Sequence, residues 1–235
     1  MLLKTICFAL LLASVVNAQQ DRPKPVMTSF RADRDVPLTT NPASSFWSKA
    51  GRAYAEVDPQ GKLEPYYRTE VRSRWTETNL YFLFICPYKQ LYLKSKPDVQ
   101  HETFELWNWN VAEVFLGSDF QNIRRYKEFE LSPHGEWVDL DIDIDKPHHE
   151  EGWKWNSGFE HAARIDESRH VWYAVMRIPF AALTTAKPAA GTVFRINLFR
   201  TEGPPASQHE IVWQPTMSQT FHVPERFGLL KLETR

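Results

Sequence analysis

The feature that most constrains the fold of this sequence is a succession of short apolar or alternating segments separated by turn residues. Thr69–Trp75 alternates polar and apolar side chains, Leu80–Cys86 is a continuous apolar run, and Glu77–Asn79 between them is typical of a hairpin turn. Similar segments follow at short spacing. We expect further strands at Met27–Arg31, Ala112–Leu116, Tyr126–Leu131, Trp137–Ile144, Glu160–Ile165, Val171–Ile178, Val193–Arg200, Ile211–Gln214 and Gly228–Leu232.

Almost no long stretch of the chain has the 3.6-residue period of a helix. Pro42–Lys49, with Asn41 as its cap, and Pro179–Leu183 each predict a short helical turn. The pattern therefore predicts an all-β fold, an antiparallel β-sandwich of about ten short strands with one or two helical turns. We expect one domain over residues 27–235 after a proline-containing linker at 19–26, because no composition shift divides the rest.

The first segment, Met1–Ala18, has the pattern of a secretory signal peptide. Lys4 precedes a mostly apolar run, and small residues near Ala18 offer a cleavage site. The run is too short for a stable membrane span, and cleavage would leave Cys86 as the single cysteine. We expect an exported protein, periplasmic or extracellular, without an internal disulfide or a membrane span after signal cleavage.

Composition narrows the class of ligand. Lys plus Arg is 28 and Asp plus Glu is 29 in 235 residues, and this near-neutral balance argues against a nucleic-acid partner. The chain has 9 Trp, 15 Phe and 8 Tyr, which favours a ligand recognised by ring stacking. Trp107 and Trp109 precede the strand Ala112–Leu116, and on an extended segment both rings would point to one face. A pyranose could stack there while polar side chains bind its hydroxyls.

The loop before the last predicted strand offers another ring. Pro224 and Gly228 bound a tight turn, for which we expect Phe221 to be exposed and Phe227 to point inward.

Acidic residues are patterned in two places. Asp139, Asp141, Asp143 and Asp145 alternate with apolar residues, which indicates a solvated edge face, with Ca²⁺ binding as the alternative. Glu128 and Glu130 share one face of Tyr126–Leu131, and paired carboxylates can hydrolyse glycosides. The cluster at 148–151, two His followed by two Glu, is interpreted as a solvated loop.

The order of the motifs resembles the carbohydrate-binding module family 9-like domains of secreted bacterial proteins, over about residues 27–233. The segments that carry the resemblance are Leu80–Phe84, Ala112–Leu116, Tyr126–Pro133, Trp172–Leu183, Phe194–Arg200, Trp213–Thr216 and Phe221–Gly228.

The resemblance implies a sugar, often near a chain end, held between two aromatic rings at the rim of a β-sandwich. One ring corresponds to Trp107, for which Trp109 could substitute, and the other to Phe221, where sugar-binding members usually have Trp. Some members also hold structural Ca²⁺.

Polar site residues carry over less completely. The acidic residue of the family's "VE" motif corresponds to Glu113, whereas a basic residue that helps to bind sugar in some members corresponds to Glu130. Arg200 or Gln219 would then supply the hydrogen-bond donors.

Three functions are compared on this basis. The first is non-catalytic binding of a mono- or oligosaccharide or a polysaccharide chain end, in support of polysaccharide breakdown alongside a glycoside hydrolase. The second is haem binding through Met176, Met217 or His222, without a Cys-x-x-Cys-His attachment site. The third is a glycoside hydrolase that uses Glu128 and Glu130 or the Asp run.

Overall fold

A computed structural model describes residues 23–146 and 152–234 of the chain. The predicted signal peptide, the first part of the linker and the cluster at 148–151 lie outside the described residues. The signal peptide and the domain boundaries therefore stay predictions. None of the helices in the described ranges is both long enough and apolar enough to cross a membrane.

The all-β prediction is confirmed, because strands dominate the structure and the helical segments that lie wholly within the described residues are short. The strands are β1 (Val26–Arg31), β2 (Gly51–Ala55), β3 (Thr69–Trp75), β4 (Asn79–Pro87), β5 (Val111–Gly117), β6 (Arg125–Leu131), β7 (Trp137–Asp143), β8 (Glu160–Asp166), β9 (Val171–Pro179), β10 (Val193–Glu202), β11 (His209–Val212) and β12 (Gly228–Glu233). The helical segments are α1 (Ser45–Ser48) and the 3₁₀ turns η1 (Pro65–Tyr67), η2 (Leu106–Asn108), η3 (Phe180–Ala182), η4 (Pro205–Ser207) and η5 (Pro224–Arg226).

Pairing of the strands departs from the prediction. All twelve belong to one sheet, with the order β7-β6-β5-β10-β12-β1-β3-β4-β9-β8, while β11 pairs with β10 and β2 with β3. β1 runs parallel to both β12 and β3, so the expectation of purely antiparallel strands was wrong. Side-chain alternation identifies a strand and its buried face but does not specify its partner or direction.

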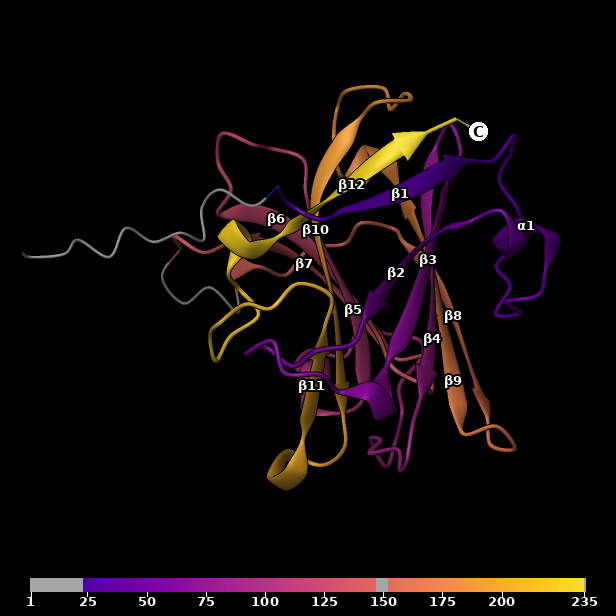
Figure 1. The fold of residues 1–235 in the computed structure, drawn as a ribbon, viewed down its shortest axis with the longest axis vertical. Coiled ribbons are helices and arrows are strands. Elements are labelled where there is room, and N and C mark those ends of the chain that lie inside the picture. The colour runs from indigo at the N-terminus through magenta and orange to yellow at the C-terminus, as the bar shows by residue number, and fades with distance from the viewer. Residues whose placement is uncertain (1–22, 147–151, 235) are drawn as a thin grey trace, which may run out of the picture.

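The sheet curls so that its two halves face each other. In Figure 1, β5, β6 and β7 lie on one side, β3, β4, β8 and β9 on the other, and β1 runs beside β12 between them. Phe82 and Trp172 from one half belong to the same buried cluster as Val114 and Ile196 from the other. This main core stabilises the fold through burial of apolar surface.

A second apolar cluster covers the outer face of β5, β6, β7 and β10. On β5 the residues alternate, so that Val114 faces the main core and Phe115 belongs to the outer cluster. Phe199, Leu140 and Phe227 complete much of this outer cluster. A sheet half that is covered on both faces explains why all seven residues of β5 are buried.

Local predictions near the N-terminus were partly wrong. β2 was not predicted, and the helix expected at Pro42–Lys49 is reduced to α1. The side chain of Ser44 caps α1 by accepting a hydrogen bond from the Trp47 amide, whereas Asn41 binds the Ala43 amide.

Candidate functional site

A cavity of about 370 Å³ opens on the outer face of the half-sheet that contains β5 and β6. Five aromatic residues line it: Phe104, Trp107, Phe115, Trp153 and Phe221. Most of the other lining residues are polar: Asn108, Glu113, Glu128, Thr201, Gln208, Glu210, Gln219, Thr220 and His222. Aromatic walls with a few converging polar groups are typical of a site for a small ligand.

Two of the rings, Trp107 and Phe221, come from segments far apart in the sequence. Trp107 lies on η2 and is half-buried, with Phe104 packed edge-on against it at 5.3 Å between ring centroids. Phe221 is also half-buried, rather than exposed as expected, because it stacks on Phe199 with centroids 4.3 Å apart and planes 13° from parallel. Phe227, as predicted, is fully buried.

Further contacts fix the wall of the cavity around His222. The His222 ring stacks on Phe115 at 5.3 Å, and its Nδ1 lies 2.6 Å from the hydroxyl of Tyr126. Trp153 donates a hydrogen bond from Nε1 to the Asp143 carbonyl at 2.9 Å. Rings held by packing and hydrogen bonds form a preformed surface, which reduces the entropy lost on ligand binding.

Three glutamates lie together at the cavity: Glu113 and Glu128 line it, and Glu130 is next to them. Glu113 on β5 stands opposite Glu130 on β6, and Phe115 stands opposite Glu128, so the period of two brings all three carboxylates to the outer face. Their exposed fractions are 1%, 0% and 3% in the order Glu113, Glu130 and Glu128. One oxygen of each lies within 4.8 Å of the others.

The environment disfavours ionisation of these acids. Burial, and then repulsion among neighbouring carboxylates, raises the pKa of Glu113 and of Glu130 well above the ordinary value, while burial raises the pKa of Glu128 to about 7. No Lys or Arg is among the described residues that line the cavity. The three carboxyl groups are therefore buried together without a compensating positive charge among the described residues that line the cavity.

Four of the six predicted site residues line the cavity: Trp107, Glu113, Gln219 and Phe221. Trp109 lies outside it, with the Lys94 ammonium 5.7 Å from its ring. The reason is that η2 replaces the extended segment on which both rings would share a face, and Glu105 just before η2 has a φ of 61°. Trp107 therefore lines the cavity, whereas Trp109 lies outside it.

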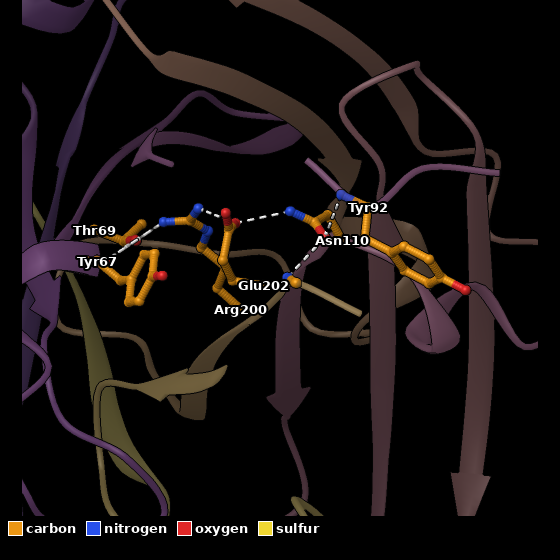
Figure 2. A network of polar contacts seen from close by, with 7 residues as sticks. Tyr67, Thr69, Tyr92, Asn110, Arg200 and Glu202 are labelled. Atoms are coloured by element: carbon orange, nitrogen blue, oxygen red, sulfur yellow. Dashed lines mark hydrogen bonds and ion pairs between the residues drawn. The ribbon is translucent and has the colours of Figure 1, made fainter. Parts of the chain in front are cut away.

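Arg200 also lies away from the cavity, in a buried network of polar contacts within the sheet. Its neighbour Phe199 faces the outer cluster, so the alternation of β10 turns Arg200 to the opposite face, where it is fully buried. There it pairs with Glu202 and donates to Thr69 Oγ1 at 3.2 Å, as Figure 2 shows. A ligand in the cavity would not reach this guanidinium, which is fully buried and does not line the cavity.

The same network anchors the segment that carries Trp107. The side-chain amide of Asn110 donates a hydrogen bond from Nδ2 to Glu202 at 2.8 Å. Its Oδ1 accepts hydrogen bonds from the backbone amides of Tyr92 and Gly203 at 3.1 and 3.0 Å (Figure 2). These contacts tie loop 88–110 to the end of β10. The network thereby holds η2 in place at the rim of the cavity.

Among the described residues, the carboxylates of the Asp run have separate partners and are not in a metal-ligand cluster. Asp139 accepts from the Ser157 amide at 3.0 Å, Asp141 pairs with Lys127 at 2.7 Å, and Asp143 pairs with Arg125 at 3.1 Å. Asp145 pairs with Arg124 at 2.6 Å. The prediction of a wholly solvated face was wrong, because Asp139 and Asp143 are buried.

Much of the site was not predicted from the sequence. Phe104, Trp153 and Glu210 line the cavity but belong to no recognised motif. Glu128 was considered only as a catalytic partner of Glu130, and Glu130 also as the counterpart of a basic sugar-binding residue. The missing step was the pairing of β5 with β6, which brings Glu113 beside them. The two tryptophans of the long Asp145–Phe159 stretch were the available signal for Trp153.

The fold and the cavity together define an all-β protein with a preformed site for a small ligand on one sheet face. The model of the family described as "Carbohydrate family 9 binding domain-like" matches residues 42–235, and the chain belongs to this family. The resemblance expected from the motif order is thereby confirmed. No curated protein matches the sequence.

Solved structures similar to this chain share its fold at low identity. A candidate carbohydrate-binding protein from Bacteroides uniformis ATCC 8492 has a TM-score of 0.70 and 15% identity, covering 89% of this chain and all of that one. A family 9 carbohydrate-binding module from Caldicellulosiruptor kristjanssonii in complex with glucose has a TM-score of 0.63 and 13% identity, with 90% and 97% covered. The cellotriose complex of such a module gives 0.61 and 14%, with 88% and 94% covered.

Proposed function

We propose that this protein binds a carbohydrate, a mono- or oligosaccharide or the end of a polysaccharide chain, in the cavity on the outer face of β5 and β6. The observation that carries the proposal is the combination of two separate aromatic rings, Trp107 and Phe221, with a bottom of carboxylates and amides in one cavity. Membership of family 9, and the glucose and cellotriose bound by similar modules, support it.

Stacking supplies most of the binding energy in this proposal. The C–H face of a pyranose is apolar and covers an aromatic ring well, whereas its hydroxyls remain directed outward. Phe199 already covers one face of Phe221, so the sugar uses the opposite face of that ring. Phe221 also offers less area than a Trp, which predicts modest affinity.

Hydrogen bonds to the hydroxyls supply orientation. Glu113 and Gln219 are the predicted polar partners, and Asn108, Gln208 and Thr201 add amide and hydroxyl groups around the same cavity. Each sugar hydroxyl both donates and accepts, so carboxylates and amides suit it without any need for Arg200.

The binding that we propose is non-catalytic. A glycoside hydrolase needs two carboxyl groups on opposite sides of the scissile bond, whereas Glu128 and Glu130 are two residues apart on the same face of β6. They lie close enough to interact directly, and Glu130 does not line the cavity. A sugar above them therefore has both on one side.

The haem alternative receives no support from the positions of its candidate ligands. Met176 is buried in the main core, and Met217 is 48% exposed and outside the cavity. His222, the third candidate, stacks on Phe115. The three side chains do not converge on one space.

Export and partnership complete the proposal. The signal peptide pattern of Met1–Ala18 supports action in the periplasm or outside the cell, next to a glycoside hydrolase that degrades the same polymer. Comparison of whole cells, periplasm and medium by immunoblot tests the location. Retention of the uncleaved chain in the cytoplasm would contradict it.

Titration calorimetry with glucose, cellotriose and a panel of other mono- and oligosaccharides tests the function. We expect a saturable response to at least one sugar, with Trp fluorescence changing in parallel because Trp107 and Trp153 line the cavity. Absence of any response at millimolar sugar would refute the proposal. Each titration is run both with Ca²⁺ and with a chelator.

A further inference from the structure

The glutamates under the cavity have an unmet requirement for a positive partner. Both carboxylate oxygens of Glu130, together with Oε1 of Glu113 and Oε2 of Glu128, are buried and accept no hydrogen bond from any donor in the described ranges. A buried ionised group without a partner costs several kcal/mol, so such groups are normally paired or bound to a metal. The three residues with these unsatisfied oxygens also lie close together, with one oxygen of each within 4.8 Å of the others.

The small space between the three carboxylates suits a metal ion better than an organic cation. Glu113 and Glu128 line the cavity, whereas Glu130 lies beneath them and does not. A ligand that contacts all three oxygens, which lie within 4.8 Å of one another, must itself be small. Ca²⁺ binds carboxylate oxygens at about 2.3–2.6 Å, which matches a central ion reached by one oxygen from each residue.

Charge also favours a divalent ion. Three ionised carboxylates carry three negative charges, so an ammonium group would leave two of them uncompensated and a divalent cation only one. Carboxylate-only ligand sets select hard cations, such as Ca²⁺, Mg²⁺ or Mn²⁺, over softer metals. Water from the open side of the cavity can complete the coordination shell.

We propose that Glu113, Glu128 and Glu130 form a binding site for a hard divalent cation, with Ca²⁺ as the best match, at the bottom of the cavity. This site differs from the Asp run on β7, whose carboxylates have separate protein partners. It does not depend on sugar binding, because the ligands belong to the strands themselves.

The test is a titration of Ca²⁺ into chelator-treated full-length protein at pH 8 without sugar. We expect one ion per chain at the cluster, with a dissociation constant on the order of 10⁻⁴ M, and a higher melting temperature in Ca²⁺. Glu130→Gln keeps the side-chain volume but removes the charge, and it should weaken this binding at least about tenfold, a loss of one charged ligand. Glu128→Gln repeats the test in case Glu130→Gln does not fold.

Glu136→Gln is the matched control. Glu136 is buried and also has one oxygen without a hydrogen-bond partner, but it lies outside the cluster and the cavity. Its variant should bind Ca²⁺ like the wild type. Unchanged Ca²⁺ binding in both Glu130→Gln and Glu128→Gln would overturn the proposal, as would no response of the wild type to about 10 mM Ca²⁺.

Glucosamine, added to the chelated protein, tests the organic-cation reading. Cation-independent binding of glucosamine that Glu130→Gln abolishes would overturn the proposal in favour of an amine site. Failure of the wild type to bind any sugar while it still binds Ca²⁺ would refute the proposed function alone.

Discussion

Buried glutamates lie at two places in the paired strands β5, β6 and β10, and only one of the two places has a cationic partner within the described chain. One oxygen of Glu202 accepts hydrogen bonds from the Arg200 guanidinium and from the Asn110 side-chain amide. Glu113, Glu128 and Glu130 lie close to one another, and no cationic side chain among the described residues forms an ion pair with them. The first cluster joins the loop 88–110 to the sheet, and the second lies beneath a cavity. The glutamate that is paired within the chain thus has a structural role, whereas the unpaired glutamates lie at the candidate site.

The physical reason lies in the cost of buried charge. A buried ion pair roughly offsets its own desolvation, but removal of one partner leaves the other charge exposed to a low dielectric. A cluster that leaves its charges unpaired keeps a strong field available for a ligand. Each of the following predictions changes one side of this comparison.

The largest effect is expected for Arg200→Met, which turns the compensated cluster into an uncompensated one. The variant leaves Glu202 buried without its guanidinium, and we expect a loss of about 3–5 kcal/mol in the free energy of unfolding. Urea denaturation measures this loss. Arg68→Met is the control, because the Arg68–Glu56 pair is largely exposed and its removal should cost at most about 1 kcal/mol. Equal losses in both variants would contradict the comparison.

The second prediction concerns pH in chelated protein. The folded pKa of Glu128 is about 7, above that of the unfolded chain, so between about pH 4.5 and 7 the folded state binds the extra proton. Stability is therefore greatest below this window and falls as pH rises through it. We expect Glu128 to account for about 3 kcal/mol of that decrease, from its shift of pKa.

Other titratable groups also change the free energy of unfolding over this pH range. Glu113, Glu130 and Glu210 also have raised pKa values and act in the same direction, while His222 lies near them. His161, whose pKa burial lowers to about 4, acts in the opposite direction below pH 6.5. Urea unfolding from pH 5 to 9 should show a smaller decrease for Glu128→Gln than for wild type. An unchanged slope in that variant, with Glu136→Gln as reference, would count against the assignment.

The third prediction separates the two tryptophans of loop 88–110. Trp107→Ala should weaken binding of the best sugar at least about tenfold, or about 1.4 kcal/mol, because it removes one stacking surface. Trp109→Ala should change affinity less than about twofold, since Trp109 does not line the cavity. Calorimetry on both variants measures this difference. A larger loss for Trp109→Ala would show that the cavity is not the sugar site.

The smallest effect is expected for Phe221→Trp. The larger ring offers more stacking area, and we expect a gain of a few-fold in sugar affinity, about 0.5–1 kcal/mol. Phe199→Leu, measured beside it, removes the ring that supports Phe221. A loss of affinity on Phe221→Trp would indicate that the cavity is sized for the smaller ring.

Much of the fold was predictable because alternation and turn residues act locally. Eleven of the strands were recognised close to their observed positions, from Met27–Arg31 to Gly228–Leu232. β2 was missed because Gly51 and two alanines lack the β-branched character of a typical strand. The parallel pairing of β1 depends on contacts with β12, nearly the whole chain away.

The site was predictable only in part, for the same reason. Trp107, Glu113 and Phe221 were identified from motifs and Gln219 as a substitute hydrogen-bond donor, and the structure brings all four to one cavity. Arg200 was predicted there as a substitute hydrogen-bond donor and Trp109 as a substitute for Trp107, whereas the face of β10 and the turn η2 direct them elsewhere. Spacing within a strand does not say which of its faces borders the cavity.

The sequence by itself determined that this chain forms strands, which of their residues are apolar, and that it is rich in rings that could stack. Only the tertiary structure decided that β5 and β6 pair in the register that joins Glu113 to Glu128 and Glu130, and that Arg200 belongs to Glu202. The reason is that side-chain periodicity is a local property, whereas the compensation of a buried charge depends on which distant strand becomes its neighbour.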